Sequence, residues 1–174
     1  MKLYHGSNTK IDSINLAMCR PYKDFGTGFY LTDIKEQAER MAVRVSKIYG
    51  GKPVLNVFNI RDDFRTLSDI KIKNFGEQTT EEWARFVMNN RNPLFHDIKD
   101  ELCNRDNKYD IVIGPVADDN MALLFRQYEN KMIDFATLLK GMIYKKTSSQ
   151  YSFHTEKSIR LLKKEENRWA FKNN

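Results

Sequence analysis

A strand and the start of a helix meet in the segment Gly28-Phe29-Tyr30-Leu31-Thr32-Asp33, and the predicted architecture is built outward from it. The run from Phe29 to Leu31 is typical of a short strand that follows a glycine turn. Asp33, with Glu36 three residues later, resembles a capping pair that starts a helix. Apolar residues then recur at the spacing of one helix face: Ala38, Met41, Ala42, Val45, Ile48 and Tyr49. The segment therefore predicts a strand followed by an amphipathic helix.

Further strands are predicted from runs of apolar, β-branched or aromatic residues. Tyr109-Asp110-Ile111-Val112-Ile113 is almost continuously apolar and is followed by Gly114-Pro115, which predicts a buried central strand that ends there. Ser149 to Phe153 alternates polar with aromatic residues, as a half-buried strand does. The other strands are predicted at Lys2 to His5, at Pro53 to Ile60 and, closing a sheet, at Glu165 to Phe171.

Three more helices are predicted from their caps and apolar patterns. Thr79-Thr80 with Glu82 precedes the pattern that begins at Trp83, Asp118 starts the next helix, and Met132 to Tyr144 carries the last pattern. Strands are scattered singly among these helices, and no glycine-rich phosphate loop follows the first strand. The order of elements therefore predicts an α+β fold rather than a doubly wound nucleotide-binding fold.

The composition predicts a single domain over residues 1–174 with a sizeable core. The chain has 41% hydrophobic and 30% charged residues, and neither a repeat nor a linker interrupts it. Cys19 and Cys103 form no CxxC pair and no cluster with histidine, which argues against a disulfide framework and against a bound metal. No apolar run reaches the roughly 20 residues that span a bilayer. We therefore expect a cytoplasmic protein.

The net charge of +6 comes from the C-terminal part of the chain. Residues 131–174 hold 10 basic and 4 acidic side chains, whereas residues 1–130 hold 19 of each. A lysine-rich surface that maintains solubility is the favoured interpretation. A basic face that attracts nucleic acid or another anionic partner is the alternative.

Three fragments place polar or aromatic groups at strand ends and turns: Tyr4-His5-Gly6-Ser7, Phe25-Gly26-Thr27-Gly28-Phe29-Tyr30 and Ser149-Gln150-Tyr151. Taken singly each is ordinary, because a lone histidine or a glycine pair usually serves a local hydrogen bond or a turn. In this order and spacing they resemble the motifs of the ADP-ribosyltransferase superfamily, in the branch with a His, Tyr, Glu triad that includes diphtheria toxin and the poly-ADP-ribose polymerases. The run from Asp110 to Asp119 also looks like an intracellular bacterial family of this fold.

The resemblance implies two split β-sheets with flanking helices and an NAD cleft between the sheets. It assigns seven residues to NAD binding: His5, Gly6, Ser7, Gly28, Phe29, Tyr30 and Met41. His5 would hydrogen-bond the adenosine ribose, the backbone of Gly6 would bind the nicotinamide carboxamide, and Tyr30 would stack on the nicotinamide ring. Stacking of a cationic pyridinium on a tyrosine is favourable by about 1 kcal/mol. The glycines Gly6 and Gly28 would let the backbone approach the ligand closely.

Two positions depart from the family pattern. The family has a second aromatic residue where this chain has Met41, and a catalytic glutamate where it has Gln150. An amide keeps a hydrogen bond to the ribose 2'-hydroxyl but supplies no negative charge against the positive charge that builds on the ribose. We therefore expect slow turnover, and faster nicotinamide release from Gln150→Glu. Asp24 and Glu156 are alternative carboxylates, although a loop and the first turn of a helix explain them locally.

The activity that the resemblance implies is NAD-dependent mono-ADP-ribosyl transfer, a glycosyltransferase reaction, with His5, Tyr30 and Gln150 as catalytic residues. ADP-ribose would pass to a protein or nucleic-acid acceptor with release of nicotinamide. The chain would act as a bacterial toxin paired with a small antitoxin protein. One alternative is an NAD-binding module without turnover, and another is an RNA 2'-phosphotransferase-like enzyme.

Overall fold

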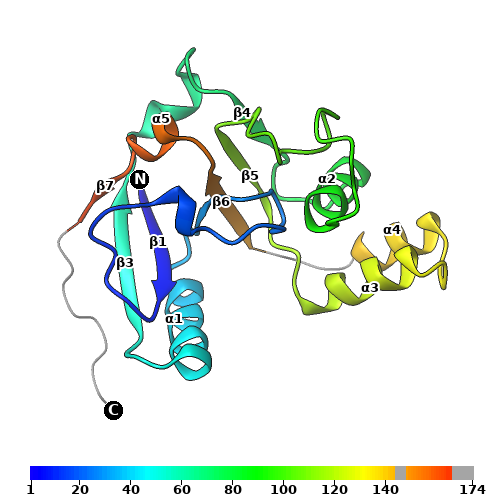
Figure 1. Cartoon of the computed structure of the whole chain (residues 1–174), viewed down its shortest axis with the longest axis horizontal. Helices are drawn as coiled ribbons and strands as arrows, with labels where there is room; N and C mark the ends of the chain where they lie inside the picture. Colours follow the sequence, from blue (N-terminus) through cyan, green and yellow to red (C-terminus); the bar gives the residue numbers. More distant parts are fainter. Residues whose placement is uncertain (144–147, 166–174) are drawn as a thin grey trace.

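The computed structural model describes residues 1–143 and 148–165, which form a mixed α+β fold with two small sheets (Figure 1). The first sheet has the order β1-β3-β7 and is antiparallel. Its strands are β1 (Lys2–Ser7), β3 (Val54–Asn59) and β7 (Lys163–Lys164). The second sheet has the order β2-β6-β5-β4, with only the β4–β5 pair parallel. Its strands are β2 (Phe29–Leu31), β6 (Ser149–Phe153), β5 (Ile111–Pro115) and β4 (Ile72–Asn74).

The helices lie on both sides of this pair of sheets (Figure 1). They are α1 (Lys35–Tyr49), α2 (Glu81–Arg91), α3 (Asp119–Glu129), α4 (Phe135–Ile143) and the short α5 (Glu156–Ile159). Short 3-10 turns cover Leu16–Met18 and Asp62–Thr66. Helix α1 packs on β1 and β3, whereas α2, α3 and α4 lie beyond the far side of the second sheet. None of these described helices combines the length and apolar character needed to cross a membrane.

Strand β5 separates two apolar cores, because its side chains alternate between the faces of the second sheet. Ile111 and Ile113 join a core that includes Leu3 and Phe58 of the first sheet. Val112 joins the other core, which the helices α2, α3 and α4 cover. All five residues of β5 are buried. The predicted central strand is therefore confirmed, and its near-continuous apolar run reflects burial of both faces.

The predicted starts of α2 and α3 are confirmed by their caps. The Thr80 hydroxyl accepts a hydrogen bond from the Trp83 N–H, and the Asp118 carboxylate accepts one from the Met121 N–H. These contacts satisfy amide groups that have no partner within the first turn of the helix.

The predicted start of α1 is wrong. Ile34 occupies the cap position and contributes no side-chain cap, while the Thr32 hydroxyl accepts from the Ile34 N–H at 3.2 Å. The Asp33 carboxylate instead accepts a hydrogen bond from the Tyr151 hydroxyl at 3.2 Å. A contact with a strand far along the chain therefore replaces the local capping pair with Glu36.

The predicted apolar face of α1 is only partly buried. Ala38 and Ala42 are buried, but Met41 is 46% exposed, and Ile48 and Tyr49 are exposed as well. The reason is the close approach of the helix to β1, where a Cβ atom on Gly6 would lie 1.9 Å from the carbonyl oxygen of Ala38. Small residues make this contact, so the larger apolar residues of α1 remain outside it.

Strand ends also differ from the prediction. β5 continues through Gly114 and Pro115, which pair with Gln150 and Ser149, and β1 continues through Ser7. The closing strand is β7, at Lys163–Lys164. Most of the predicted closing strand, residues 166–171, and Tyr144 of the last predicted helix lie outside the described residues.

We expect Ile113→Ala to lower the free energy of unfolding by about 2 to 5 kcal/mol, because it removes a buried aliphatic side chain and leaves a cavity. Ile113 is only 4% exposed in the core between the sheets. Chemical denaturation measures the change. The matched control is Leu94→Ala at a position that is 77% exposed, and it should unfold like the wild type. Equal stability of both variants would contradict the central position of β5.

Candidate functional site

The two sheets meet at one pair of residues and separate immediately beyond it. The Tyr4 N–H donates to the Thr32 carbonyl at 2.7 Å, and the Thr32 N–H donates to the Tyr4 carbonyl at 3.0 Å. If this antiparallel ladder continued, Gly6 would face Tyr30. Instead, the ring nitrogen Nδ1 of His5 lies 2.7 Å from the Tyr30 carbonyl oxygen. A side chain therefore takes the place of the strand partner, and β1 diverges from β2.

The divergence leaves the backbone of Gly6 without a partner in β2. Backbone groups along a strand point alternately to its two neighbours. Those of Tyr4 point to β2, so those of His5 point to β3 and those of Gly6 point into the opening between β1 and β2. Among the described residues, none makes a hydrogen bond with the Gly6 N–H or carbonyl on that side. Because Gly6 is buried, this donor and acceptor are candidates for hydrogen bonds with a bound group.

His5 presents a hydrogen-bond acceptor beside Gly6. A carbonyl only accepts, so Nδ1 of His5 must carry the proton that the Tyr30 carbonyl receives. Burial lowers the pKa of His5, against the opposing effect of this hydrogen bond. The neutral ring therefore keeps Nε2 as an acceptor. Its orientation is fixed by the Tyr30 carbonyl and by stacking on Phe29, with ring centroids 4.6 Å apart.

Tyr30 is held from its phenol end. Its hydroxyl donates to the Gly26 carbonyl at 2.7 Å and accepts from the Phe25 N–H at 3.0 Å. Burial, followed by the negative charge of Asp24, raises the pKa of Tyr30 well above its ordinary value. The phenol therefore stays protonated, and the half-buried ring has a fixed position that meets His154 edge to face.

Gln150 lies in a buried polar network. Its Nε2 donates to Oδ2 of Asp24 at 2.7 Å and to the Pro115 carbonyl at 3.3 Å. The same Oδ2 accepts from the Ala117 N–H at 3.0 Å. Oδ1 of Asp24 accepts from Nε and Nη2 of Arg91, at 2.9 and 2.6 Å. A buried carboxylate, balanced by an arginine, thus lies directly behind Gln150.

Asp24 lies in a loop, as predicted from the sequence, but the prediction that local contacts explain it is wrong. Its partners are Arg91, Ala117 and Gln150, which lie 67, 93 and 126 residues away in the chain. The sequence analysis assigns neither Arg91 nor Ala117 to a site. An aspartate just before a glycine turn carried no local signal of these partners. The other alternative carboxylate, Glu156, begins α5 as expected.

The two glycines assigned to ligand contact have internal reasons to be glycine. A Cβ on Gly28 would lie 2.6 Å from Nδ1 of His154. A Cβ on Gly6 would collide with α1 at Ala38. Each glycine therefore permits close packing within the fold, and the expectation that their backbones approach a ligand stays a prediction.

The structure brings some of the predicted site residues together and leaves others apart. His5, Gly6 and Tyr30 meet at the divergence of β1 and β2, and Gln150 lies on β6, the strand that pairs with β2. Phe29 belongs to the core beneath His5. The Ser7 hydroxyl contacts the Thr9 hydroxyl at 3.3 Å, and Met41 lies on the exposed side of α1.

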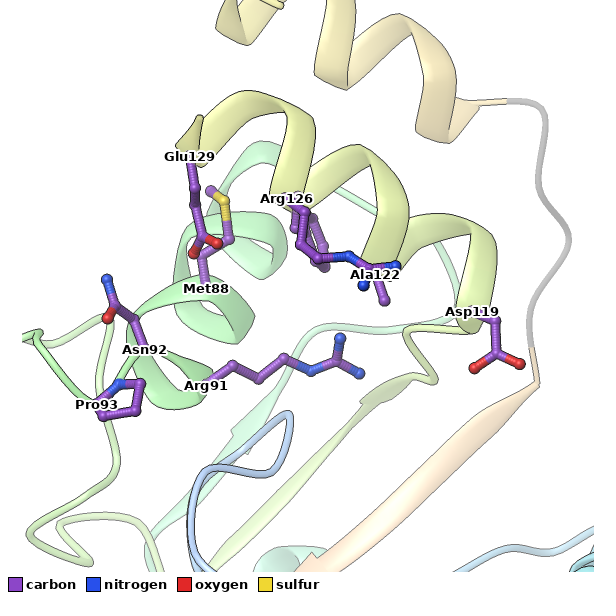
Figure 2. Close-up of a pocket in the computed structure, with 9 residues that line it drawn as sticks. Met88, Arg91, Asn92, Pro93, Asp119, Ala122, Arg126 and Glu129 are labelled. Atoms are coloured by element: carbon purple, nitrogen blue, oxygen red, sulfur yellow. The ribbon is translucent and has the colours of Figure 1, made fainter. Parts of the chain in front are cut away.

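Two hollows lie along α2, away from the divergence of the strands. The first has a volume of about 510 Å³ and lies between α2 and α3 (Figure 2). In Figure 2 the side chain of Arg91 extends beneath α3, and Asp119 and Arg126 line the hollow from α3 above it. The second hollow has a volume of about 360 Å³. Arg91 is the connection between the first hollow and the network at Gln150, because it lines one and belongs to the other. Within residues 1–143 and 148–165, no three His, Cys, Asp or Glu side chains gather as a metal site.

The family model described as "Protein of unknown function (DUF3990)" matches residues 1–164. The chain belongs to the DUF3990 family. No curated protein and no solved structure matches it. The DUF3990 match runs from β1 to β7, so it includes the divergence at Gly6 as well as Asp24 and Gln150.

His154 is a buried histidine that lies outside the three motif fragments of the sequence. Its Nδ1 lies 2.8 Å from the Thr27 carbonyl oxygen and its Nε2 lies 2.8 Å from the Ser152 hydroxyl. Burial lowers its pKa to about 4. The unfolded chain, with a pKa near 6.5, therefore binds a proton between these two values that the folded chain does not bind.

We expect His154 to lower the free energy of unfolding by roughly 3 kcal/mol as the pH falls from about 6.5 to about 4, because the unfolded state gains the proton first. His154→Gln should therefore show a smaller fall in the free energy of unfolding over this range than the wild type. Denaturant titrations at several pH values measure both. His96→Gln, at an exposed position, is the control and should keep the wild-type slope. The same slope in all three proteins would contradict a neutral, buried His154.

Proposed function

We propose that this protein is an NAD-dependent mono-ADP-ribosyltransferase that binds nicotinamide at the divergence of β1 and β2. The observation that carries the proposal is the N–H and carbonyl of Gly6, which no residue in the described parts of the chain pairs on the side of the opening. A primary carboxamide has one acceptor oxygen and two donor hydrogens. It is therefore complementary to a strand edge that offers one donor and one acceptor side by side. Nicotinamide carries such a group, and the motif resemblance independently assigns this glycine to it.

The neighbouring side chains support the same ligand. Nε2 of His5 is an acceptor suited to a ribose hydroxyl, and the ring of Tyr30 is suited to stacking on a cationic pyridinium. Alternation along the strands puts Tyr30 and Gln150 on the same face of the second sheet, opposite Phe29 and Tyr151. Gln150 is then suited to a hydrogen bond with the ribose next to the nicotinamide.

The proposed reaction breaks the glycosidic bond between the ribose C1' and the nicotinamide nitrogen. The bonding electron pair leaves with nicotinamide, which becomes neutral, and the positive charge passes to the ribose. A nucleophile of the acceptor then bonds to C1' and loses its proton to solvent. Gln150 contributes a hydrogen bond without charge, so the reaction is slow compared with one assisted by a carboxylate.

A specific observation favours a second candidate, an NAD-binding module without turnover. The side chain of Gln150 is only 9% exposed, and its Nε2 is engaged by Asp24. An amide fixed in this way serves recognition as well as it serves catalysis. Nicotinamide release, measured beside NAD binding, separates the two candidates.

We expect NAD to bind at least about tenfold more tightly than its deamidated form, in which a carboxylate replaces the carboxamide. The carboxylate cannot donate to the Gly6 carbonyl and leaves that buried acceptor unsatisfied. Isothermal titration calorimetry with both ligands measures the ratio. Equal affinities, or no binding of either ligand, would contradict the assignment of Gly6 to the carboxamide.

We expect His5→Ala to weaken NAD binding roughly tenfold, because it removes one hydrogen bond to the ligand. His96→Ala, at an exposed position, is the matched control and should bind NAD like the wild type. The melting temperatures of both variants test whether the fold persists. Wild-type affinity in a folded His5→Ala variant would remove His5 from the site.

A further inference from the structure

The chemistry around Gln150 fixes the orientation of its carboxamide. One end of the amide faces the Asp24 carboxylate and the Pro115 carbonyl, which both only accept hydrogen bonds. The nitrogen must therefore lie at this end. The other end, Oε1, receives no hydrogen bond from any residue in the described parts of the chain. The amide thus has one anchored end and one acceptor that is still unpaired.

The anchor is itself held rigidly. Arg91 donates two hydrogen bonds to Oδ1 of Asp24, and its Nη2 also lies 3.0 Å from the Ala117 carbonyl oxygen. The Ala117 N–H donates to Oδ2. Helix α2, the segment after β5 and strand β6 therefore converge on one carboxylate. Four donors surround Asp24, so its carboxylate has little freedom to turn.

We infer that Asp24 is the positioning residue of the nicotinamide–ribose site: it holds Gln150 through Nε2, so that Oε1 is presented as the acceptor for a donor group of the ligand, such as a ribose hydroxyl. This inference rests on the proposed function and deepens it. Asp24 touches Gln150 and not the ligand, so it acts through the amide. The negative charge that the motif resemblance expects at position 150 lies instead one hydrogen bond behind it.

The same contact explains why position 150 holds an amide. A glutamate there would bring a second carboxylate against Oδ2 of Asp24, which now accepts from Nε2 at 2.7 Å. Two carboxylates in contact do not both ionise easily, and one of them retains a proton to higher pH. The expectation that Gln150→Glu speeds nicotinamide release is therefore reversed near neutral pH, where the added charge is repelled.

The groups around position 150 come from several elements. Asp24 lies in the loop before β2, Arg91 on α2 and Tyr30 on β2. The negative charge of Asp24 helps to raise the pKa of the Tyr30 phenol. β5 faces Gln150 with Gly114, which does not titrate. Since Tyr30 stays protonated and Arg91 stays charged near neutral pH, a new titration in Gln150→Glu belongs to the pair of carboxylates.

The first test needs no ligand. The stability of Q150E relative to the wild type is measured by denaturation between about pH 5 and pH 8. The introduced carboxyl group, when protonated, can donate to Asp24 in the folded state, so its folded pKa is raised and stability is lost as the pH rises. Each unit by which the folded pKa exceeds the unfolded pKa changes the unfolding equilibrium constant tenfold. In the control D24N/Q150E, which removes one carboxylate, the difference from D24N should not vary with pH in this way. A constant difference between Q150E and wild type would overturn the contact.

If Q150E fails to fold at every pH, the double variant decides the matter: a folded D24N/Q150E supports the carboxylate clash, and an unfolded one overturns it.

The second test measures nicotinamide release. We expect D24N to lower kcat by about 10- to 100-fold, with a smaller change in KM, because misplacing a group that contacts the reacting ribose costs this much. Q150E should recover activity as the pH falls, a profile that a merely structural role does not produce.

The two tests separate the inference from the proposed function. If the wild type neither binds NAD nor releases nicotinamide, the proposed function and the ligand role of Oε1 both fail, whatever the stability comparison shows. If the wild type binds NAD but D24N matches its kcat and affinity, the positioning role of Asp24 alone is overturned.

Discussion

The pair of hydrogen bonds between Tyr4 and Thr32 is the contact on which the arrangement of the molecule depends. It joins the two sheets at one point and lets them separate beyond it. Had the ladder continued, Gly6 and Tyr30 would satisfy each other and the junction would be an ordinary antiparallel sheet. Because it stops, the buried backbone of Gly6 keeps a donor and an acceptor that no described residue pairs on that side, and our proposal assigns them to the ligand.

Helix α1 packs closely on β1 at the residue where the ladder stops. Gly6 lies so close to Ala38 that any side chain at position 6 would displace the helix. β1 packs against α1 and pairs with β3, while β2 pairs with β6. The imidazole of His5 lies between the diverging strands and donates a hydrogen bond to the Tyr30 carbonyl. One glycine thus lies both at the close contact with α1 and at the opening beyond Tyr4.

Much of the fold could be predicted from the sequence, because the relevant signals are local. The strand at Ser149–Phe153 and the caps at Thr80 and Asp118 are predicted from residues within a few positions of each other. The prediction that this strand is half-buried is wrong, because four of its five residues are buried between elements that the alternation does not reveal. The errors concern contacts across the chain. Asp33 was assigned to a nearby cap but bonds Tyr151, and Asp24 was assigned to local contacts but bonds residues on three other segments. No local pattern encodes which distant donors will surround a loop carboxylate.

The electrostatics of the site follow from where the carboxylate lies rather than from whether one is present. A buried carboxylate is tolerated only with a matching cation and hydrogen-bond donors, and Arg91 and the Ala117 N–H meet this need at position 24. A second carboxylate at position 150 would find no further cation among these partners. The amide is therefore the residue type that Asp24 allows there: it donates toward the existing charge and turns its only acceptor the other way. Gln150, taken in the sequence for a loss of charge, is then one half of a pair whose charged half lies in another segment of the chain.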